Sequence, residues 1–266
     1  MYNLAAVEEE LAGTIYAGKV HFAPVTGSTN SDAIAAARTG APHGSVFFAD
    51  EQTAGRGRGD HAWHSAAGEG LYVSVLLRPE LAPAYLPLAP LAAGLAAADA
   101  IRAATGLDVD LRWPNDLLLG PRKTGGILVE AQSESNAVAF VVVGIGINVH
   151  QRWFDPGLAT PGTSLDLELG HAFGQRTSRQ ALLAGLLKSL EREAMGLLDP
   201  ATRRLIPARV DAASSWVRGR QVEVHGPQMY TGTTEGLDEH GFLRLRTAEG
   251  VVQVQSGGIR ERASSS

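Results

Sequence analysis

Residues 123–149 read KTGGILVEAQSESNAVAFVVVGIGINV, and they indicate a β-sheet at the centre of the fold. Two runs within them, 124–132 and 137–149, are rich in the apolar and β-branched residues that favour strands. The second run is almost entirely apolar, which is typical of a strand that is central in a sheet or covered on both faces. Residues 19–25, 45–51, 70–78 and 109–113 have similar character, so we expect further strands there.

Three long segments predict helices that pack on these strands. Ser28 or Thr29 is placed to cap a helix that runs to about Arg38, with Gly40 as its stop. Residues 83–106 are rich in alanine and leucine, with prolines confined to the first turns, and indicate a buried helix. Residues 178–198 have amphipathic spacing, and a further helical segment ends near Val217.

The pattern changes after Arg218, where short alternating strands are separated by Gly, Asp, Glu and His. These strands predict a small β-barrel or sandwich of about 45 residues, too small for a typical stand-alone domain and expected to dock on the first unit. We therefore expect a main unit of residues 1–217, a β unit of residues 218–262 and a disordered tail of residues 263–266.

The composition argues against several classes of protein. The chain has 266 residues and a net charge of −5, which disfavours a general nucleic-acid binder. It contains no cysteine, so disulfides, thiolate zinc sites and a cysteine nucleophile are excluded, and a reducing cytoplasm fits. No apolar run reaches 18 residues, which argues against a membrane-spanning helix, and the acidic N-terminal residues argue against an export signal.

Three patterns resemble ligand sites without meeting their requirements. GTIYAGKV (13–20) has the spacing of a phosphate loop, but Val20 stands where Ser or Thr would bind magnesium. VGIGINV (143–149) lacks the third glycine and the following helix of a dinucleotide site. His61 and His64 have a metal-compatible spacing but no evident third ligand, which favours solvated loop histidines.

Residues 51–65 read EQTAGRGRGDHAWHS and combine backbone freedom with positive charge. Glycines let backbone N–H groups approach a ligand closely, and arginines supply forked donors for carboxylate or phosphate. Trp63 is suited to stack on a flat ring, so the segment fits a phosphorylated or adenylylated ligand. On its own, the segment fits a mobile surface loop with solvated arginines about as well as it fits a ligand site, and an RG-rich RNA contact is a further alternative.

Three other stretches strengthen the ligand-binding hypothesis. TGSTN (26–30) gathers small hydroxyl and amide side chains where a strand meets a helix, although N-capping alone would explain it. RWPND (112–116) places an amide and a carboxylate at a strand end, where a turn is the alternative. KTGGILVE (123–130) sets one of only three lysines before two glycines, where its ammonium either reaches an anion or is solvated.

TGSTN, Q-x-x-GRGR with Trp63, WPND, K-x-GGIL and GIGIN stand in this order, and the chain resembles the biotin protein ligases. The resemblance covers roughly residues 20–150, extends loosely to TSL at 163–165, and includes the C-terminal β unit. It implies an α+β fold. The catalytic domain (1–217) would be a mixed central sheet flanked by helices, followed by a small SH3-like β-barrel (218–262).

The implied activity is that of a biotin–[biotin carboxyl carrier protein] ligase. Biotin and ATP give biotinyl-5′-AMP and pyrophosphate, and a lysine of a biotin carrier domain then takes the biotin as an amide. Mg²⁺ would be the activator, with its ligands unknown. The anionic intermediate must be stabilised and kept from water, which suits a glycine-hinged loop that carries arginines. This chemistry explains why flexibility and positive charge coincide in residues 51–65.

The resemblance also implies roles for individual residues. The expected biotin-binding residues are Ser28, Thr29, Asn30, Gln52, Gly55, Arg56, Gly57, Arg58, Lys123 and Gly126. The expected residues for ATP or adenylate are Arg56, Arg58, Trp63, Asn115, Lys123, Gly144 and Asn148, with Trp63 or Trp153 stacking on adenine. The expected catalytic residues are Lys123, Arg58 and Asp116, the last either positioning phosphate groups or helping to deprotonate the acceptor lysine.

Two other functions stay open at this level. Lipoate or octanoate ligases share the fold, and a non-catalytic biotin-binding module would share the pocket, although Lys123 and Arg58 together favour catalysis. The residues before the first strand are few and acidic, so we expect an enzyme that does not bind DNA. The expected partner is the biotin carboxyl carrier domain of a biotin-dependent carboxylase, in the cytoplasm and without a membrane; a homodimer is compatible with the sequence.

Overall fold

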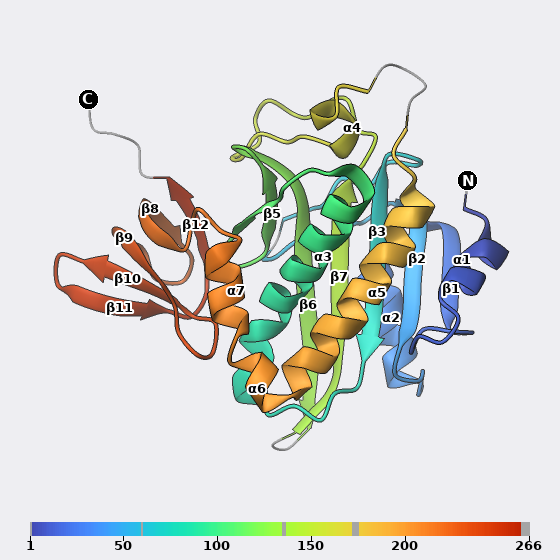
Figure 1. Ribbon diagram of the computed structural model, residues 1–266, viewed down its shortest axis with the longest axis horizontal. Helices are drawn as coiled ribbons and strands as arrows, with labels where there is room; N and C mark the ends of the chain where they lie inside the picture. Colours follow the sequence, from blue (N-terminus) through green and yellow to red (C-terminus); the bar gives the residue numbers. More distant parts are fainter. Residues whose placement is uncertain (1, 60, 135–136, 172–175, 262–266) are drawn as a thin grey trace.

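The computed structural model describes residues 2–59, 61–134, 137–171 and 176–261 (Figure 1). Its centre is a seven-stranded sheet in the order β1-β2-β3-β7-β6-β5-β4. Within the described residues β1 and β2 pair in parallel and the other neighbours pair antiparallel, so the sheet is mixed as expected. The strands are β1 (Val20–Thr26), β2 (Ser45–Gln52), β3 (Gly70–Leu77), β4 (Asp110–Arg112), β5 (Asp116–Leu119), β6 (Arg122–Glu134) and β7 (Ala137–Asn148).

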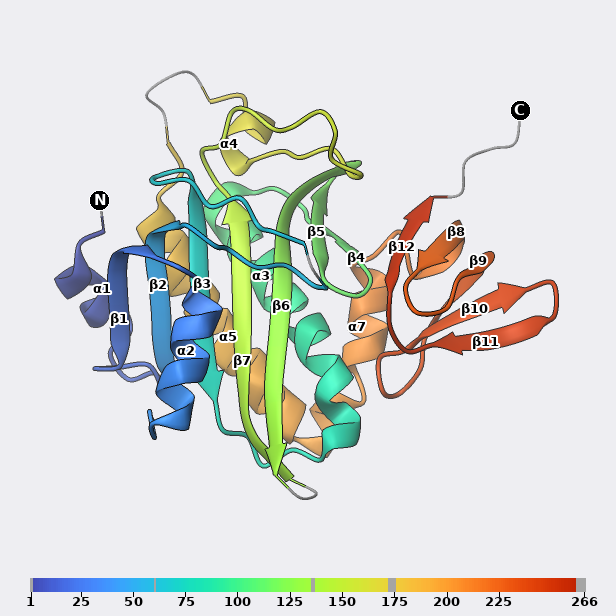
Figure 2. The same cartoon turned by 180° about the vertical axis from the view of Figure 1, so that it is seen from behind.

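Helices cover both faces of this sheet (Figures 1 and 2). Helices α3 and α5 pack together over one face, and α2 lies on the other face against β2, β3 and β7. The helices are α1 (Leu4–Glu10), α2 (Thr29–Arg38), α3 (Ala89–Thr105), α4 (Leu165–Glu168), α5 (Arg179–Leu198), α6 (Pro200–Arg203) and α7 (Ile206–Ala212), and a 3₁₀ turn, η1 (Pro83–Leu88), precedes α3.

The central strands are apolar because both of their faces are covered. Every residue of β3 is buried, and β7 is buried from Phe140 to Asn148 except at Gly146. This confirms the central position that the apolar run of residues 137–149 predicts.

Contrary to the expectation from the sequence, one helical segment, Pro83–Thr105, is long and apolar enough to cross a membrane by length and composition. Most of this segment is buried inside the fold, where α3 packs against α5 and β6. The same apolar content is what a core helix between a sheet and a second helix requires.

The C-terminal unit is a five-stranded antiparallel sheet in the order β11-β10-β9-β8-β12. Its strands are β8 (Arg218–His225), β9 (Tyr230–Leu237), β10 (Leu243–Thr247), β11 (Gly250–Val254) and β12 (Gly258–Glu261). The SH3-like fold class is confirmed, but the expected closed barrel is wrong: among the described residues β11 and β12 lie at opposite edges and do not pair. The main unit contacts this unit at the connection between β9 and β10, where Trp113 Nε1 donates to the Gly241 carbonyl at 3.0 Å.

Four elements were not predicted from the sequence patterns, namely α1, α4, β5 and β12. Strand β5 has only four residues and is held by pairing with β4 on one side and β6 on the other, which no local pattern reveals. The helical segment expected to end near Val217 ends at Ala212. The tail of residues 263–266 lies outside the described residues.

Candidate active site

A cavity of about 1110 Å³ lies beside β6 and β7, and the edge of the C-terminal sheet forms part of its wall. Figure 2 shows the connection between β2 and β3 crossing over β7 and β6 at this place. The cavity brings together every residue that the sequence predicts for the site: Ser28, Thr29, Asn30, Gln52, Gly55, Arg56, Gly57, Arg58, Trp63, Asn115, Asp116, Lys123, Gly126, Gly144, Asn148 and Trp153. The rejected GTIYAGKV pattern lies elsewhere, and its Lys19 ammonium donates to the carbonyls of Ile15 and His43.

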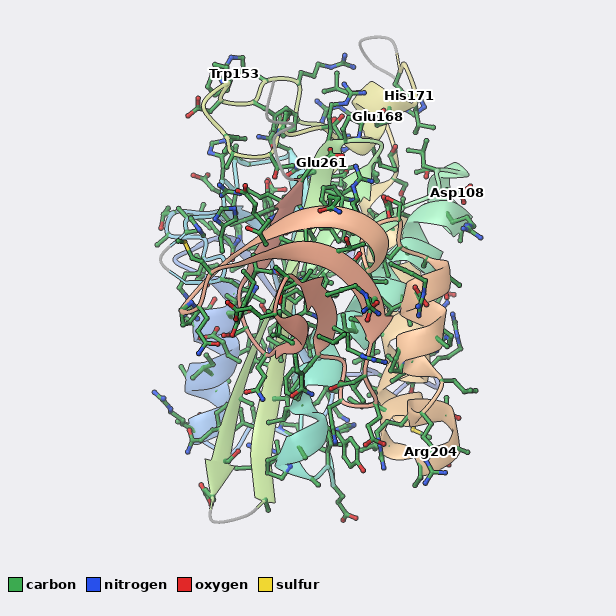
Figure 3. The ribbon with its side chains drawn as sticks, turned by 90° about the vertical axis from the view of Figure 1, so that its left-hand side faces the viewer. Asp108, Trp153, Glu168, His171, Arg204 and Glu261 are labelled. Carbon is green, nitrogen blue, oxygen red and sulfur yellow. The ribbon has the colours of Figure 1, made fainter. Side chains whose placement is uncertain are left out.

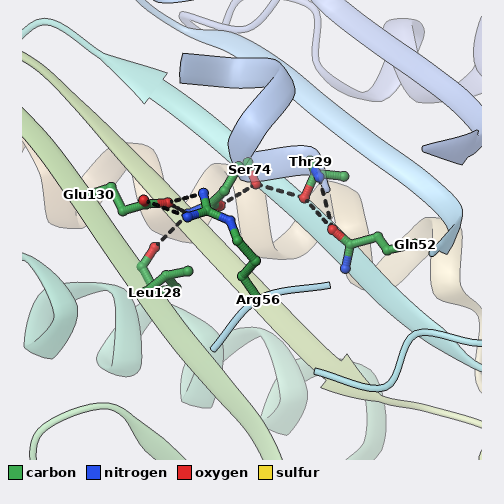
Figure 4. A network of polar contacts seen from close by, with 7 residues as sticks. Thr29, Gln52, Arg56, Ser74, Leu128 and Glu130 are labelled. Carbon is green, nitrogen blue, oxygen red and sulfur yellow. Dashed lines mark hydrogen bonds and ion pairs between the residues drawn. The ribbon is translucent and has the colours of Figure 1, made fainter. Parts of the chain in front are cut away.

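One end of the cavity is lined by neutral polar side chains at the start of α2 (Figure 4). The Thr29 amide donates to Gln52 Oε1 at 2.9 Å, and the Thr29 hydroxyl lies 3.1 Å from the same oxygen. Ser74 Oγ of β3 lies 2.8 Å from Thr29 Oγ1. The side chain of Ser28 makes no capping hydrogen bond and lines the cavity, so its hydroxyl is not committed to the helix as capping would require. This end suits an uncharged polar ligand group.

Next to this cluster, Asn30 connects α2 to β6. Asn30 Nδ2 donates to Glu130 Oε2 at 2.8 Å and to the Leu128 carbonyl at 3.2 Å, and Ser74 Oγ lies 2.6 Å from Asn30 Oδ1. The guanidinium of Arg56 forms a two-pronged ion pair with Glu130, with distances of 2.9 and 2.6 Å (Figure 4). Arg56 therefore spans from the GRGR stretch to the sheet.

The other end of the cavity is charged. The Lys123 ammonium lies 2.5 Å from Asp116 Oδ1, and Arg112 contacts Asp116 Oδ2 at 2.6 Å. Burial would raise the pKa of Asp116, but the adjacent charges of Lys123 and Arg112 and their hydrogen bonds outweigh it and hold the pKa below its ordinary value. Arg112 also donates to Thr160 Oγ1 at 2.8 Å. Asp116 is thus ionised at neutral pH and anchors two cations.

Arg58 extends from the GRGR stretch toward the C-terminal unit. Its guanidinium donates to the Gly257 carbonyl at 2.9 Å and to Asn115 Oδ1 at 3.4 Å. Burial lowers the pKa of Arg58 while Asp116 opposes the shift, and a guanidinium remains charged under such conditions. Asn115 is itself fixed, because its Nδ2 donates to the Ile127 carbonyl at 2.7 Å.

Glycines of β6 and β7 make room for Trp63 at the cavity floor. A Cβ on Gly146 would lie 2.5 Å from Trp63 Nε1, and a Cβ on Gly126 would lie 3.5 Å from the same indole ring. Gly144 likewise has no room for a Cβ beside the Asn30 amide. The Lys123 ammonium lies 5.5 Å from the centre of the indole, within the range of a cation–π contact. The GGIL and GIGIN glycines therefore allow close approach at this floor.

The remaining predicted residues differ in their surroundings. Asn148 Nδ2 donates to the Thr163 carbonyl at 3.0 Å and so joins β7 to the TSL stretch. Trp153 is 72% exposed and lies at the outer surface (Figure 3), whereas Trp63 lies within the cavity over Gly126 and Gly146.

Residues that contact the predicted set and were missed include Ser74, Arg112 and Glu130. The sequence could have identified Glu130 as a site residue, because strand alternation places it on the same face of β6 as Gly126 and Leu128. Arg112 begins the quoted RWPND stretch, but its role depends on the pairing of β4 with β5, which brings Arg112 opposite Asp116. Ser74 stands in a wholly buried strand and carries no local signal.

The charged end of the cavity offers Mg²⁺ few oxygen donors from the protein. Among the described residues, no three side chains of His, Cys, Asp or Glu come together as a metal site. Mg²⁺ commonly keeps several waters and binds one or two carboxylates together with substrate phosphates. Asp116 and Asn115 supply oxygens beside Lys123 and Arg58, which fits an ion held largely by phosphate and water.

Comparisons with known proteins agree with this geometry. Residues 22–148 match the biotin/lipoate A/B protein ligase family, and residues 218–259 match the biotin protein ligase C-terminal domain. A bifunctional ligase/repressor BirA of Bacillus spizizenii is 35% identical over 240 residues, which cover 88% of this chain and 71% of that protein. A biotin–[acetyl-CoA-carboxylase] ligase of Mycobacterium tuberculosis is 34% identical over 242 residues, covering 88% of this chain and 85% of that protein.

The chain belongs to the biotin protein ligase family. A solved biotin protein ligase from Aquifex aeolicus, in complex with biotin and ATP, superimposes with a TM-score of 0.78 at 28% identity, over 93% of this chain and 100% of that one. The family resemblance and the α+β ligase fold with its SH3-like C-terminal unit are therefore confirmed. As a biotin protein ligase, the chain is an enzyme that uses biotin and ATP. The roles of its individual residues remain predictions.

Proposed function

We propose that this ligase joins biotin to ATP in the cavity and transfers the biotin to a lysine of the biotin carboxyl carrier domain of a carboxylase. The observation that carries the proposal is the arrangement of the cavity, with a neutral polar end at Thr29 and Gln52 and a charged end at Lys123, Asp116 and Arg58. Biotin has a matching polarity, since a neutral ureido ring is joined by an apolar chain to a carboxylate.

The ureido ring would bind at the start of α2. Ser28, Thr29, Asn30 and Gln52 line that end and include both donors and acceptors, as a ring with one carbonyl and two N–H groups requires. Gln52 is oriented for this by its Nε2, which donates to Ser65 Oγ at 2.8 Å. The chain of biotin would then lie along the glycine floor, toward Lys123.

In the first step, a carboxylate oxygen of biotin attacks the α-phosphorus of ATP, the bond to the β-phosphate breaks, and pyrophosphate leaves. Both reactants are anions, so the barrier contains a large repulsion that fixed cations reduce. Lys123 and Arg58 would supply these charges, and Asp116 would hold the Lys123 ammonium in place. Mg²⁺, when bound with the nucleotide, would neutralise phosphate charge beside Asn115 and Asp116.

In the second step, the neutral amine of the acceptor lysine attacks the carbonyl carbon of biotinyl-5′-AMP. The C–N bond forms, the C–O bond to phosphate breaks, and AMP leaves while the amine loses a proton. Asp116 is a poor base for this proton because its pKa is lowered and both of its oxygens face cations. We therefore favour a positioning role for Asp116 over deprotonation of the lysine.

The test is ATP–pyrophosphate exchange by the purified protein with magnesium, with biotin, lipoate or octanoate as the acid. Exchange that depends on biotin supports the proposal, and biotin transfer to a carrier domain completes it. Exchange with lipoate or octanoate instead would assign the chain to the neighbouring activity, and no exchange with any acid would favour a binding module. A cytoplasmic reaction fits the absence of cysteine, and gel filtration with and without biotin would test for a homodimer.

A further inference from the structure

The stretch that carries Arg56 and Arg58 pairs with the chain that returns from it: the Gly57 N–H donates to the His61 carbonyl at 2.7 Å and the Trp63 N–H donates to the Gly55 carbonyl at 2.8 Å. Gly55 and Gly57 flank Arg56, and glycine backbones move more freely than those of other residues. This local pairing does not join residues 55–58 to β6, so side-chain contacts are needed to hold the stretch against that strand. Arg56 makes such a contact, with a partner 74 positions away in the chain.

That partner, Glu130, is placed to receive it. Glu130 lies on β6, and its two oxygens receive the two terminal nitrogens of the Arg56 guanidinium at 2.9 and 2.6 Å. Asn30 Nδ2 donates to Glu130 Oε2 at 2.8 Å, so the carboxylate is also tied to α2. The Glu130 side chain is 29% exposed, which shields the ion pair in part from water. Charge-assisted, two-pronged pairs of this kind are stronger than single surface contacts.

The contact has a consequence for Arg58, one glycine further along. The Arg58 guanidinium is fixed at Gly257 and Asn115, beside Asp116 and Lys123. With Arg56 held by Glu130, residues 55–58 are fixed at both arginines and lie across the cavity. In this arrangement both terminal nitrogens of Arg56 are engaged with protein, which leaves the reacting anions to Arg58 and Lys123.

We propose that Glu130 is a positioning residue that holds residues 55–58 over the cavity through Arg56, and thereby slows the escape of biotinyl-5′-AMP before the acceptor lysine arrives. This inference rests on the proposed function. It departs from the expectation that Arg56 binds biotin and ATP directly. It also gives Glu130, which no motif marks, a role in retaining the intermediate.

The experiment is a double-mutant cycle with Glu130→Gln, Arg56→Ala and the two combined. Glutamine keeps the shape of Glu130 and one acceptor oxygen, but it lacks the charge and the second acceptor oxygen that the two-pronged ion pair with a guanidinium requires. Enzyme loaded with radiolabelled biotin and ATP forms the intermediate, and filter binding measures how fast labelled biotinyl-5′-AMP is released. We expect release to be about threefold to tenfold faster in each single variant. The double variant should be no faster than the singles, because both remove the same contact.

Two further readouts separate positioning from general damage. In pyrophosphate exchange, the single variants should raise KM for biotin more than they lower kcat, because the contact positions ligand-binding groups. Asp108→Asn removes a remote, exposed ion pair with Arg102 and should leave the release rate as in wild type. Thermal unfolding of all variants checks that each is folded.

The outcomes distinguish failure of this inference from failure of the proposed function. If the wild-type protein forms no intermediate with biotin and ATP, the proposed function fails. If the wild type forms it and Glu130→Gln releases it no faster, or the two substitutions act additively, the positioning role of Glu130 is wrong.

Discussion

The Lys123 ammonium lies 2.5 Å from a carboxylate oxygen of Asp116, at the charged end of the cavity. The backbone of Lys123 is held separately, since its N–H donates to the Pro161 carbonyl at 2.8 Å. A change of the Lys123 side chain should therefore remove a reacting-site charge without removing the local backbone pairing.

We expect Lys123→Ala to lower kcat for biotin-dependent pyrophosphate exchange by about 100-fold, the usual scale for loss of one electrostatic stabiliser. Asp116→Asn should cause a smaller loss, because the ammonium remains but is no longer anchored. Lys188→Ala, at an exposed position on α5, is the matched control and should behave as wild type. Exchange by Lys123→Ala at the wild-type rate would remove Lys123 from the catalytic set.

Asp116 also sets an expectation for the dependence of stability on pH. Its pKa in the folded protein lies below the ordinary value of 3.8, so its ionised form stabilises the fold at every pH above that value. This stabilisation is lost only as the pH falls through the lowered folded-state pKa. Urea unfolding should therefore give a constant difference between wild type and Asp116→Asn from about pH 8 to about pH 5, and a smaller difference below the ordinary pKa.

A difference that changed between about pH 5 and pH 8 would mean that the Asp116 carboxyl titrates in that range. The pKa would then be raised instead of lowered, and deprotonation of the acceptor lysine by Asp116 would become the better interpretation.

Gly126 and Gly146 both lie beside Trp63, but we expect them to respond differently to substitution by alanine. Gly146→Ala places a methyl group 2.5 Å from the Trp63 indole nitrogen, so the ring must move. Gly126→Ala places one 3.4 Å from the flexible Lys123 side chain, which can yield. We expect KM for biotin to rise about tenfold in Gly146→Ala, within the range for overpacking, and clearly less in Gly126→Ala. Equal effects, measured by pyrophosphate exchange, would contradict the role of Trp63 as a wall of the site.

Local sequence patterns predict many elements of this fold, because the residues in those elements have the propensity and the periodicity of the structure that they adopt. The helix expected from Thr29 to Arg38 and the strand of residues 137–148 occur with nearly the expected bounds. The closed barrel could not be tested by such patterns, because closure depends on whether β11 and β12 pair. Only residues 255–257 separate these two strands in the chain, yet they lie at opposite edges of the sheet. Alternating strands predict a sheet but do not determine which of its edges pair.

The candidate site likewise combines features that the sequence predicts with features that depend on tertiary structure. The motifs supply the residues that line the cavity, but not the ion pairs that orient them. Arg56 forms an ion pair with Glu130 only because β6 lies beside the GRGR stretch, and Arg112 faces Asp116 only because β4 pairs with β5. Partners that tertiary pairing brings together leave no periodic signal in a single sequence.

The contact between Trp113 and Gly241 makes a final prediction, about how the two units unfold. One apolar core includes Leu111 of β4 and Leu243 of β10, and the Trp113 N–H bonds the Gly241 carbonyl across the junction. The unit that starts at Arg218 should therefore unfold together with the main unit, in one transition that fluorescence and far-ultraviolet circular dichroism detect at the same midpoint.

Trp113→Phe should lower the free energy of unfolding by about 1 kcal/mol or more, since it leaves a buried carbonyl unpaired. The same change at exposed Trp153 is the control and should cost less than about 0.5 kcal/mol. Two separate transitions would instead mean that the C-terminal sheet is an independent folding unit.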